Sequence, residues 1–367
     1  MLNRLMSISA ATGIAAVAAL AVASSANAQD FKTTYEEIVE AAKQEPPVQW
    51  CTGLEPSESQ PIVDAFVALY PDVPEPNDFE CFGEDATQRV ISEWSAGAPQ
   101  VDILNIDNEI MDALDKDNLT HVQNWSVFDG TPVQVDPRYL SYNGRILTSG
   151  TALRVIWFNP TILSREDAPK SFEECADPKY KGIIAVDVRP TFFEMMEETG
   201  GPWSDEKLRE WAKGIKANEP LWTRGSSHNF QVISSGERGL NCGQQFHGLF
   251  RGDRTDATDP NAPVQFIIPK QVIARGYGST AIAPKPLAPN AAILFGAFMA
   301  SDKGQIAIAE ANAGYSSPFI KGTLSQRVIE EAGAEVLMAP KEKIGAAAER
   351  QNEIILTEWG FPSPAQQ

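Results

Sequence analysis

The sequence has 367 residues, of which 43% are hydrophobic, 22% charged and 9% aromatic, and its formal net charge is −19. This composition excludes a disordered chain, a collagen and a coiled coil. The excess of Asp and Glu over Lys and Arg argues against binding to nucleic acid or anionic lipid, because both partners require a basic face. The length suggests about two domains.

Residues 1–28 have the pattern of a secretory signal peptide. Arg4 precedes an apolar, Ala-rich run over 8–23, and the AxA motif at 26–28 supplies small residues for cleavage. A membrane anchor is the alternative, but the run is short for a span of about 20 residues and no charged stop-transfer segment follows. We therefore expect an exported mature chain that begins at Gln29. The net charge changes from −19 for the full chain to −20 for the mature chain, because Arg4 is lost. We expect the mature chain in a bacterial periplasm.

Four cysteines fit an oxidising compartment, where disulfides are the default. They are Cys51, Cys81, Cys175 and Cys242, without a CxxC motif or a His at metal-ligand spacing. Three connectivities are possible. Cys51 and Cys81 lie in two short strand-like runs separated by one helix, so we predict that they pair on neighbouring strands. Cys175 then pairs with Cys242 by elimination.

The first part of the mature chain alternates helical and strand-like segments. The predicted order is helix 35–43, strand 48–51, helix 59–70, strand 78–82, helix 85–95 and strand 101–106. Asp85 is the expected N-cap of the third helix. This βαβαβ order predicts parallel strands with helices on the faces of an α/β sheet.

The rest of the chain continues the alternation after a turn-rich segment at 119–150. The predicted elements are strands 151–158 and 183–188, helices 205–216 and 229–235, strands 264–268 and 279–282, helices 290–300 and 304–312, and a mostly helical tail at 325–359. Residues 239–250 mix strand and helix signals, and 251–263 form a polar loop. No Pro/Gly linker separates two sequential domains, which suggests domains that share the chain discontinuously.

Motifs for catalysis are sparse. No GxGxxG, GxxxxGK[ST], HExxH or GxSxG motif is present. Residues 226–228 (SSH) place a hydroxyl beside an imidazole, but triads form between distant segments, so a polar loop is the better interpretation. His121 is expected in a surface loop, and His247 beside Phe246 is more typical of a core or rim residue than of a metal ligand. We expect no enzymatic activity and no cofactor.

Arg189 is the strongest candidate for binding a ligand. It follows the strand at 183–188 and precedes Pro190, a residue suited to the first turn of a helix. In open α/β sheets ligands bind at the carboxyl ends of strands, where a helix N-terminus and a guanidinium favour a carboxylate or phosphonate. The alternative is a surface arginine paired with a nearby acid.

Two further polar turns occupy similar places. One spans 52–58 after the first strand, and the other spans 222–227 and contains Arg224 and Ser226. Their hydroxyls and N–H groups suit an oxyanion, with ordinary helix N-capping as the alternative for each hydroxyl.

Seven segments occur in an order and spacing that are more specific than any of them alone. They are AAKQEPPVQWCTG, IVDAFVALYPDV, RVISEWSAGAPQVDILNID, RVIWFNPTIL, SFEECADPKYKGIIAVD, VISSGERGL and ILFGAFMASDKGQIAIAEANAGYSSPF. Together they resemble bacterial extracellular solute-binding proteins of ABC importers. The nearest group is that of the ferric-iron, thiamine and phosphonate binders, with the fold called periplasmic binding protein type II.

The resemblance implies two discontinuous α/β lobes joined by two crossover strands, near 150–158 and 264–282, with a ligand held between them. We expect residues 29–150 and about 275–367 to form the first lobe, and 151–274 the second, with C-terminal helices that can pack on both. By position, the resemblance places ligand contacts at Thr52, Ser57, Asp107 and Asn108 in the first lobe. In the second lobe it places them at Arg189, Thr191, Ser226 and the stretch Gln244–His247, which includes Gln245, Phe246 and His247, with Tyr277 near the second crossover.

The chain departs from the ferric-iron binders of this group at two places. It has Phe246-His247 where they carry a Tyr-Tyr pair, and Arg189 where they use small hydroxyl residues. Phe supplies no ligand to hard ferric iron. We therefore expect a small organic anion, a carboxylate, phosphonate or sulfonate, with an apolar body against Phe246, Trp222 or Tyr277.

The partners implied are this small molecule and an ABC permease of the inner membrane, with the carrier itself a monomer. One alternative is a ferric-iron or other metal binder that uses His247, Asp107 and Glu109. Another is a protein that presents its ligand to a membrane sensor kinase, and a third is a secreted enzyme.

Overall fold

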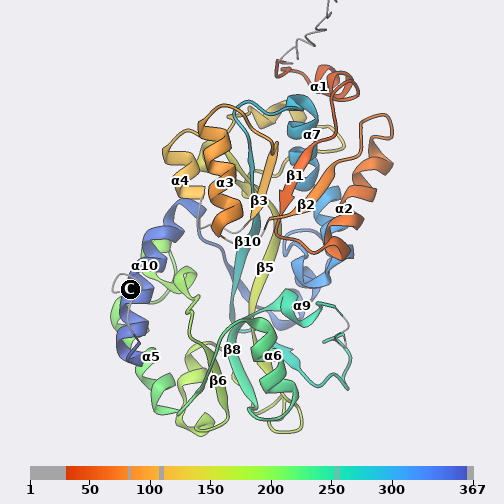
Figure 1. Ribbon diagram of the computed structural model, residues 1–367. Coiled ribbons are helices and arrows are strands. Elements are labelled where there is room, and N and C mark those ends of the chain that lie inside the picture. Colours follow the sequence, from red (N-terminus) through yellow and green to blue (C-terminus); the bar gives the residue numbers. More distant parts are fainter. Residues whose placement is uncertain (1–29, 82–83, 107–110, 253, 255, 362–367) are drawn as a thin grey trace, which may run out of the picture.

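The computed structural model describes residues 30–81, 84–106, 111–252, 254 and 256–361. The predicted signal peptide lies outside these residues. Two lobes are stacked one above the other, and two long antiparallel strands run between them (Figure 1). These strands are β5 (Ile146–Phe158) and β10 (Gln271–Ile282), which correspond to the two expected crossovers.

The first lobe has a parallel sheet with helices on both faces, as the βαβαβ pattern predicts. Its strands are β2 (Asn77–Glu80), β1 (Gln49–Thr52) and β3 (Ile103–Ile106), in that spatial order. One hydrophobic cluster lies under α1 (Tyr35–Ala42), α2 (Pro56–Leu69), α7 (Pro289–Met299) and α8 (Asp302–Ala311). The opposite cluster lies under α3 (Glu84–Ser95) and α4 (Met111–Lys116). Because α3 begins at Glu84, Asp85 lies inside the helix and is not its N-cap.

The second lobe continues the sheet through β8 (Leu240–Gln245), β6 (Ile184–Asp187) and β7 (Leu221–Thr223). One face packs on α5 (Asp205–Ala217) and α10 (Ile344–Trp359), where Trp211 and Trp359 share a hydrophobic cluster. The other face packs on α6 (Ser226–Ser234) and α9 (Leu324–Ala332), and β9 (Gln265–Ile267) extends the sheet beside β5. The chain therefore returns to the first lobe with α7 and α8 and then leaves it again, so that its last helix lies beside α5 (Figure 1).

All described strands belong to one sheet, whose main path is β2-β1-β3-β10-β5-β8-β6-β7. β10 is antiparallel to β3 on one side and to β5 on the other, so it joins the sheets of the two lobes. The strand β11 (Glu335–Leu337) pairs with β10, and β4 (Leu140–Ser141) and β9 pair with β5. Short 3-10 turns complete the fold, at Trp125–Phe128, Pro137–Tyr139, Tyr142–Gly144, Glu173–Ala176, Pro178–Tyr180, Phe193–Met195, Glu197–Thr199, Phe246–Leu249, Ala313–Tyr315 and Lys341–Lys343.

The largest differences from the predicted elements concern the crossover strands and the segment after β6. β5 starts five residues before the predicted position 151, because all thirteen of its residues are buried and no alternation marks its beginning. β10 starts at Gln271 and runs through two glycines that break the strand pattern. No α-helix begins at Pro190, since the chain there forms only the three-residue turn Phe193–Met195.

The structure contains both predicted disulfides, Cys51–Cys81 and Cys175–Cys242. The first joins the carboxyl end of β1 to the residue that follows β2, two parallel neighbours in the sheet. The second joins a turn beneath α5 to the central strand β8. Among the described residues, none of the helices is both long and apolar enough to cross a membrane.

Helix α7 depends on a distant carboxylate at its buried N-terminus. Its N-cap residue is Ala288, which has no side-chain acceptor. Glu45, itself 3% exposed, accepts hydrogen bonds from the backbone N–H groups of Asn290 and Ala291 at 2.9 and 2.7 Å. It therefore replaces the missing cap and fixes α1 against α7.

Glu45→Gln is expected to lower the free energy of unfolding of the protein by about 2 kcal/mol, because a buried charge-assisted acceptor becomes a neutral amide. Urea unfolding followed by tryptophan fluorescence measures the change. The control is Glu40→Gln, which removes an exposed partner of Lys43 and is expected to change stability by under about 0.5 kcal/mol. Equal effects of the two variants would contradict the role given to Glu45.

Candidate functional site

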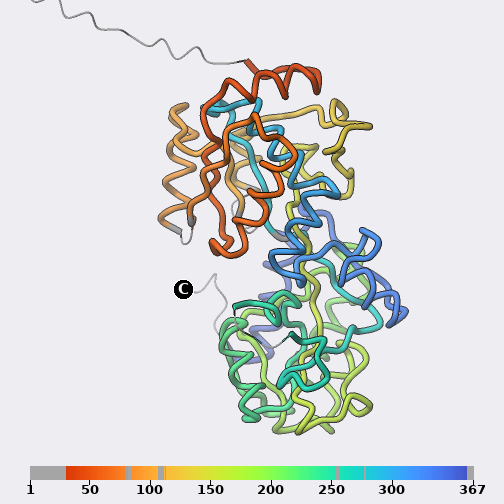
Figure 2. Tube along the Cα trace, turned by 90° about the vertical axis from the view of Figure 1, so that its right-hand side faces the viewer, coloured from red at the N-terminus to blue at the C-terminus, as the bar shows by residue number. Residues whose placement is uncertain are grey.

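The carboxyl ends of the strands of both lobes point toward the region between the lobes. Seen from the side, the red and orange first lobe lies above the green second lobe, and the crossover segments join them (Figure 2). The loop after β1 (residues 53–55) belongs to the upper lobe. The loops after β6 (188–192), β7 (224–225) and β8 (246–252) belong to the lower lobe.

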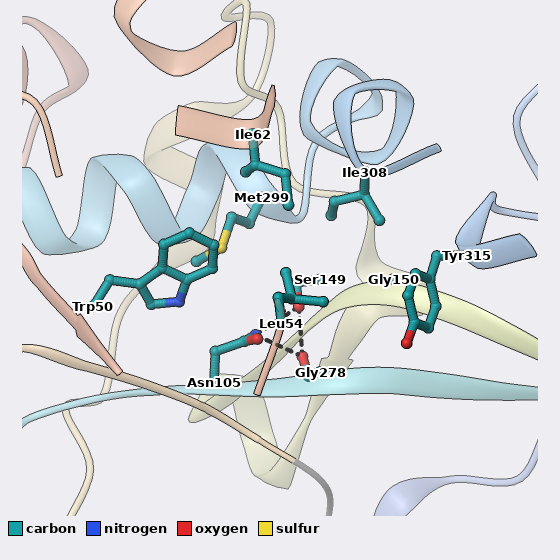
Figure 3. A pocket seen from close by; sticks show the side chains of 10 residues that line it. All are labelled: Trp50, Leu54, Ile62, Asn105, Ser149, Gly150, Gly278, Met299, Ile308 and Tyr315. Carbon is teal, nitrogen blue, oxygen red and sulfur yellow. Dashed lines mark hydrogen bonds between the residues drawn. The ribbon is translucent and has the colours of Figure 1, made fainter. Parts of the chain in front are cut away.

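The first-lobe side is fixed by a buried amide. Asn105 of β3 donates from Nδ2 to Ser149 Oγ on β5 at 2.7 Å and to Thr280 Oγ1 on β10 at 2.6 Å, and the carbonyl of Gly278 accepts from the same nitrogen at 3.2 Å (Figure 3). Its Oδ1 accepts from Thr52 Oγ1 at 3.2 Å. One side chain thus ties β1 and β3 of the first lobe to the two crossover strands, β5 and β10.

Gly278 is required at this junction. Its φ of +65° is unfavourable for side chains, and a Cβ there would lie 2.4 Å from Ser149 Oγ. The adjoining pocket has room for about one water molecule, with a volume near 10 Å³ for the centre of a water-sized sphere, so it is not a ligand site. Its lining is shown in Figure 3 and consists of Trp50, Leu54, Ile62, Asn105, Ser149, Gly150, Gly278, Met299, Ile308 and Tyr315.

Away from the crossover strands, the lobes meet in a second place around His247. The imidazole, 2% exposed, stacks on the ring of Tyr315 with centroids 4.2 Å apart. Gly314 packs so closely that a Cβ would lie 2.2 Å from the Cα of His247. Asn312 Nδ2 donates to the His247 carbonyl at 3.4 Å and to Glu58 Oε1 of α2 at 3.1 Å. We call residues Glu58, His247, Asn312, Gly314 and Tyr315 the lobe junction.

Three arginines surround the junction on the second-lobe side. Arg154, Arg251 and Arg254 all lie close enough to His247 to oppose its protonation. Burial first, and then these cations, hold the pKa of His247 well below its ordinary value of 6.5. The second lobe therefore places three guanidinium groups near the lobe junction of an acidic protein.

The arginines have different partners. Arg254 donates to the Gly248 carbonyl and to Ser227 Oγ, and its guanidinium lies 4.2 Å from the ring centroid of Phe230. Arg251 instead reaches the first lobe, where its Nη2 lies 2.6 Å from Glu55 Oε1. Arg154 is 7% exposed, in the middle of β5.

Arg189 is a surface arginine paired with a nearby acid, which is the alternative to ligand binding that the sequence left open. Its guanidinium donates twice to Asp187, at 3.1 and 3.2 Å, and its side chain is 56% exposed. The same carboxylate accepts from Gly225 N at 2.7 Å, so it holds the loops after β6 and β7 together. The helix expected beside Arg189 is absent. The ligand-binding role of Arg189 stays a prediction.

The other predicted residues are spread over several environments. Thr52 is buried in the Asn105 network, whereas Ser57 is exposed on the first turn of α2. Thr191 is half-buried and its carbonyl accepts from Arg275. Asp107 and Asn108, like Glu109, lie outside the described residues, and so does the side chain of Tyr277.

On the second lobe, Arg224 is exposed, and its backbone N–H lies 3.4 Å from His228 Nδ1. Ser226 is half-buried at the start of α6, and Gln245 is half-buried at the end of β8. Phe246 is fully buried, with its ring against Phe250 and Phe266, and is part of the lobe's core.

Trp222 packs on Trp359 and Phe361, so it supports α10 within the hydrophobic cluster that α10 shares with α5. Among the described residues, no group of three or more His, Cys, Asp or Glu side chains is placed to hold a metal ion.

Sequence reasoning did not select several residues that the fold brings to this region. They are Asn105, Ser149, Arg154, Arg251, Asn312 and Tyr315, whereas Glu55 and Glu58 lie in the polar turn 52–58 that the sequence did indicate. Two of them could have been found from the sequence, because Asn105 and Arg154 are polar residues in mostly apolar strand segments (VDILNI and TALRVIWF). The others come together only through the tertiary fold.

No protein-family model matches the sequence. A curated relative, the Fe(3+)-binding periplasmic protein of Serratia marcescens, is 24% identical over 137 residues, which are 37% of this chain and 40% of that protein. The aligned stretch therefore spans less than half the length of that relative.

Two solved structures cover nearly the whole fold. Iron-bound HitA from Pseudomonas aeruginosa superimposes with a TM-score of 0.61 at 17% identity, over 84% of this chain and 99% of that chain. The IdiA/FutA protein of Trichodesmium, in complex with iron and citrate ligands, gives 0.67 at 15% identity, over 86% and 100%. The chain thus has the two-lobed α/β fold of periplasmic binding proteins, as the sequence resemblance implied.

The buried His247 makes stability depend on pH. The unfolded chain binds a proton at this residue as the pH falls through about 6.5, whereas the folded chain does not, because the folded pKa is lowered. The contribution is therefore present above pH 6.5 and is lost as the pH falls below it. His247→Gln is expected to flatten the decline in unfolding free energy between pH 7 and pH 5, by up to about 1.4 kcal/mol per pH unit.

Urea unfolding at several pH values measures this slope. His121→Gln is the matched comparison, since burial also lowers the pKa of His121, which stacks on Phe31 far from the arginines. Each substitution should remove its own share of the slope. An unchanged slope in His247→Gln would show that this imidazole is protonated in the folded protein.

Proposed function

We propose that this protein is the solute-binding component of an ABC importer in a bacterial periplasm. It captures a small ligand between its lobes and presents it to a permease, without chemical change. The two-lobed fold supports this role, as do the predicted signal peptide and the two disulfides, which suit an oxidising compartment. Lobes joined by two strands can rotate about them and enclose a ligand, which excludes water and adds contacts from both sides.

For the ligand, we propose ferric iron carried as a complex with a small carboxylate anion. The relatives named above are iron binders, and they give no support to an organic anion as the sole ligand. One of them holds iron together with citrate. An iron ligand thus replaces the organic anion expected from the sequence.

The observation that carries this proposal is the convergence of Arg154, Arg251 and Arg254 on His247. Like charges repel at short range, so these arginines oppose a bare trivalent cation. A ferric carboxylate complex with a net negative charge is instead attracted, and its free carboxylate oxygens suit guanidinium donors. Carboxylate oxygens are also hard donors, of the kind that ferric iron favours over thiolate.

The test is isothermal titration calorimetry of the mature protein with ferric citrate, with citrate alone and with gallium citrate, a redox-inert trivalent analogue. We expect one site per chain for ferric citrate, similar affinity for the gallium complex, and binding of citrate alone that is weaker by at least about tenfold, or ~1.4 kcal/mol. Metal analysis of the protein after gel filtration should find iron and citrate together.

Equal affinity for citrate and ferric citrate would overturn the iron ligand and restore a simple organic anion. If the protein binds none of the three ligands (ferric citrate, gallium citrate and citrate), the proposal as a whole is overturned.

A further inference from the structure

We propose that Glu55 is an internal competitor of the ligand: its carboxylate occupies, on Arg251, the position that a carboxylate of the ligand takes when it binds. This inference rests on the proposed function, because it assumes a ligand with a carboxylate. It assigns a ligand-binding role to Arg251 and a regulatory role to Glu55, neither of which is suggested by the sequence.

The pair bridges the two lobes. Glu55 precedes the first turn of α2 in the first lobe, and Arg251 follows the turn Phe246–Leu249 in the second. Among the ion pairs between described residues, it is the one that links a loop of the first lobe to a loop of the second. The contact of 2.6 Å between Nη2 and Oε1 is that of a charge-assisted hydrogen bond. A carboxylate is thus already the partner that this guanidinium takes.

The surroundings of Arg251 favour such exchange. It shares the neighbourhood of His247 with Arg154 and Arg254, so the local charge stays positive when Glu55 moves away. Arg254 is held by the Gly248 carbonyl and by the ring of Phe230. Arg251 forms an ion pair with Glu55 of the opposite lobe, and opening of the lobes separates the two.

Glu55 combines a fixed backbone with an exposed side chain. Its N–H donates to Glu58 Oε2 at 3.3 Å, and Glu58 is held by Asn312 of the lobe junction. Its own side chain is 52% exposed, and that of Arg251 is 27% exposed. Ion pairs that water reaches contribute little to stability, about 0–1 kcal/mol, so a ligand carboxylate can replace this one at small cost.

The buried ion pair between Arg275 and Glu194 contrasts with the exposed pair between Glu55 and Arg251. Both side chains are nearly buried, at 12% and 1% exposure, and the guanidinium makes two bonds to the carboxylate at 2.6 and 2.7 Å. It also lies 3.7 Å from the ring centroid of Phe193. Breaking this pair would leave a buried charge, whereas the Glu55–Arg251 pair can open into water.

The test measures the affinity for ferric citrate of Glu55→Gln, Arg251→Gln and the double variant, by calorimetry at low ionic strength. Loss of the competitor in Glu55→Gln should raise the affinity by about twofold to fivefold. Loss of the guanidinium in Arg251→Gln should lower it by at least about tenfold. The double variant should bind like Arg251→Gln alone, because a competitor for the guanidinium has no effect on ligand affinity once the guanidinium is removed.

The control is Glu210→Gln, which removes one partner of an exposed ion pair with Lys213 on α5 and should leave affinity unchanged. Unfolding curves of all variants verify that they fold, and Glu55→Asp, which shortens the competitor without removing its charge, gives a second measure of the same effect. If wild type binds and Glu55→Gln binds equally well or more weakly, the competitor role is overturned while the proposed function stands. If wild type binds none of the citrate complexes, the proposed function itself fails.

Discussion

The backbone pairing between β5 and β10 is the interaction on which both lobes depend. The carboxyl end of β10 is hydrogen-bonded to β3 of the first lobe, and most of the length of β10 is hydrogen-bonded to β5. β5 in turn is paired with β8 of the second lobe. The sheets of both lobes are therefore continued from the same two paired strands, β10 on the side of the first lobe and β5 on the side of the second. Because these strands are central in the sheet, they are buried, and a polar side chain on or beside them requires an internal partner if it is not to destabilise the fold. Thr148 Oγ1 and Thr151 Oγ1 of β5 lack such a hydrogen-bond partner among the described residues.

Asn105 shows how that requirement is met. Its amide satisfies hydroxyl and carbonyl groups on β1, β5 and β10 at the level where the first lobe ends. Gly278 allows the strands to approach closely enough for these bonds. The polar groups of this network stabilise one another through hydrogen bonds. They therefore fix the positions of the strands at the end of the first lobe and are not free to hydrogen-bond a ligand.

The charges between the lobes are arranged differently from the charges of the whole chain. A net charge of −19 is spread over a large surface and is screened by salt beyond roughly 10 Å, so it has little effect on a ligand held between the lobes. The local group of Arg154, Arg251 and Arg254 acts over a few ångströms in a partly buried setting, where screening is weak. A protein of strongly acidic composition can in this way gather positive charge at one place between its lobes.

The sequence by itself determined the α/β class, the parallel first sheet and the two disulfides, because each follows from local periodicity and from the strands on which the cysteines lie, and the two-lobed arrangement followed from the resemblance to solute-binding proteins. Among the site residues, it selected His247 but not its setting. Only the tertiary structure decided that His247 stacks on Tyr315, that Arg251 meets Glu55, and that Arg189 is paired with Asp187. The residues of the first two pairs are 68 and 196 positions apart, and no periodicity within a helix or strand records a contact made across two lobes. Arg189 and Asp187 are close in sequence, but whether a guanidinium turns to a neighbouring carboxylate or toward a ligand depends on the loops that surround it in space.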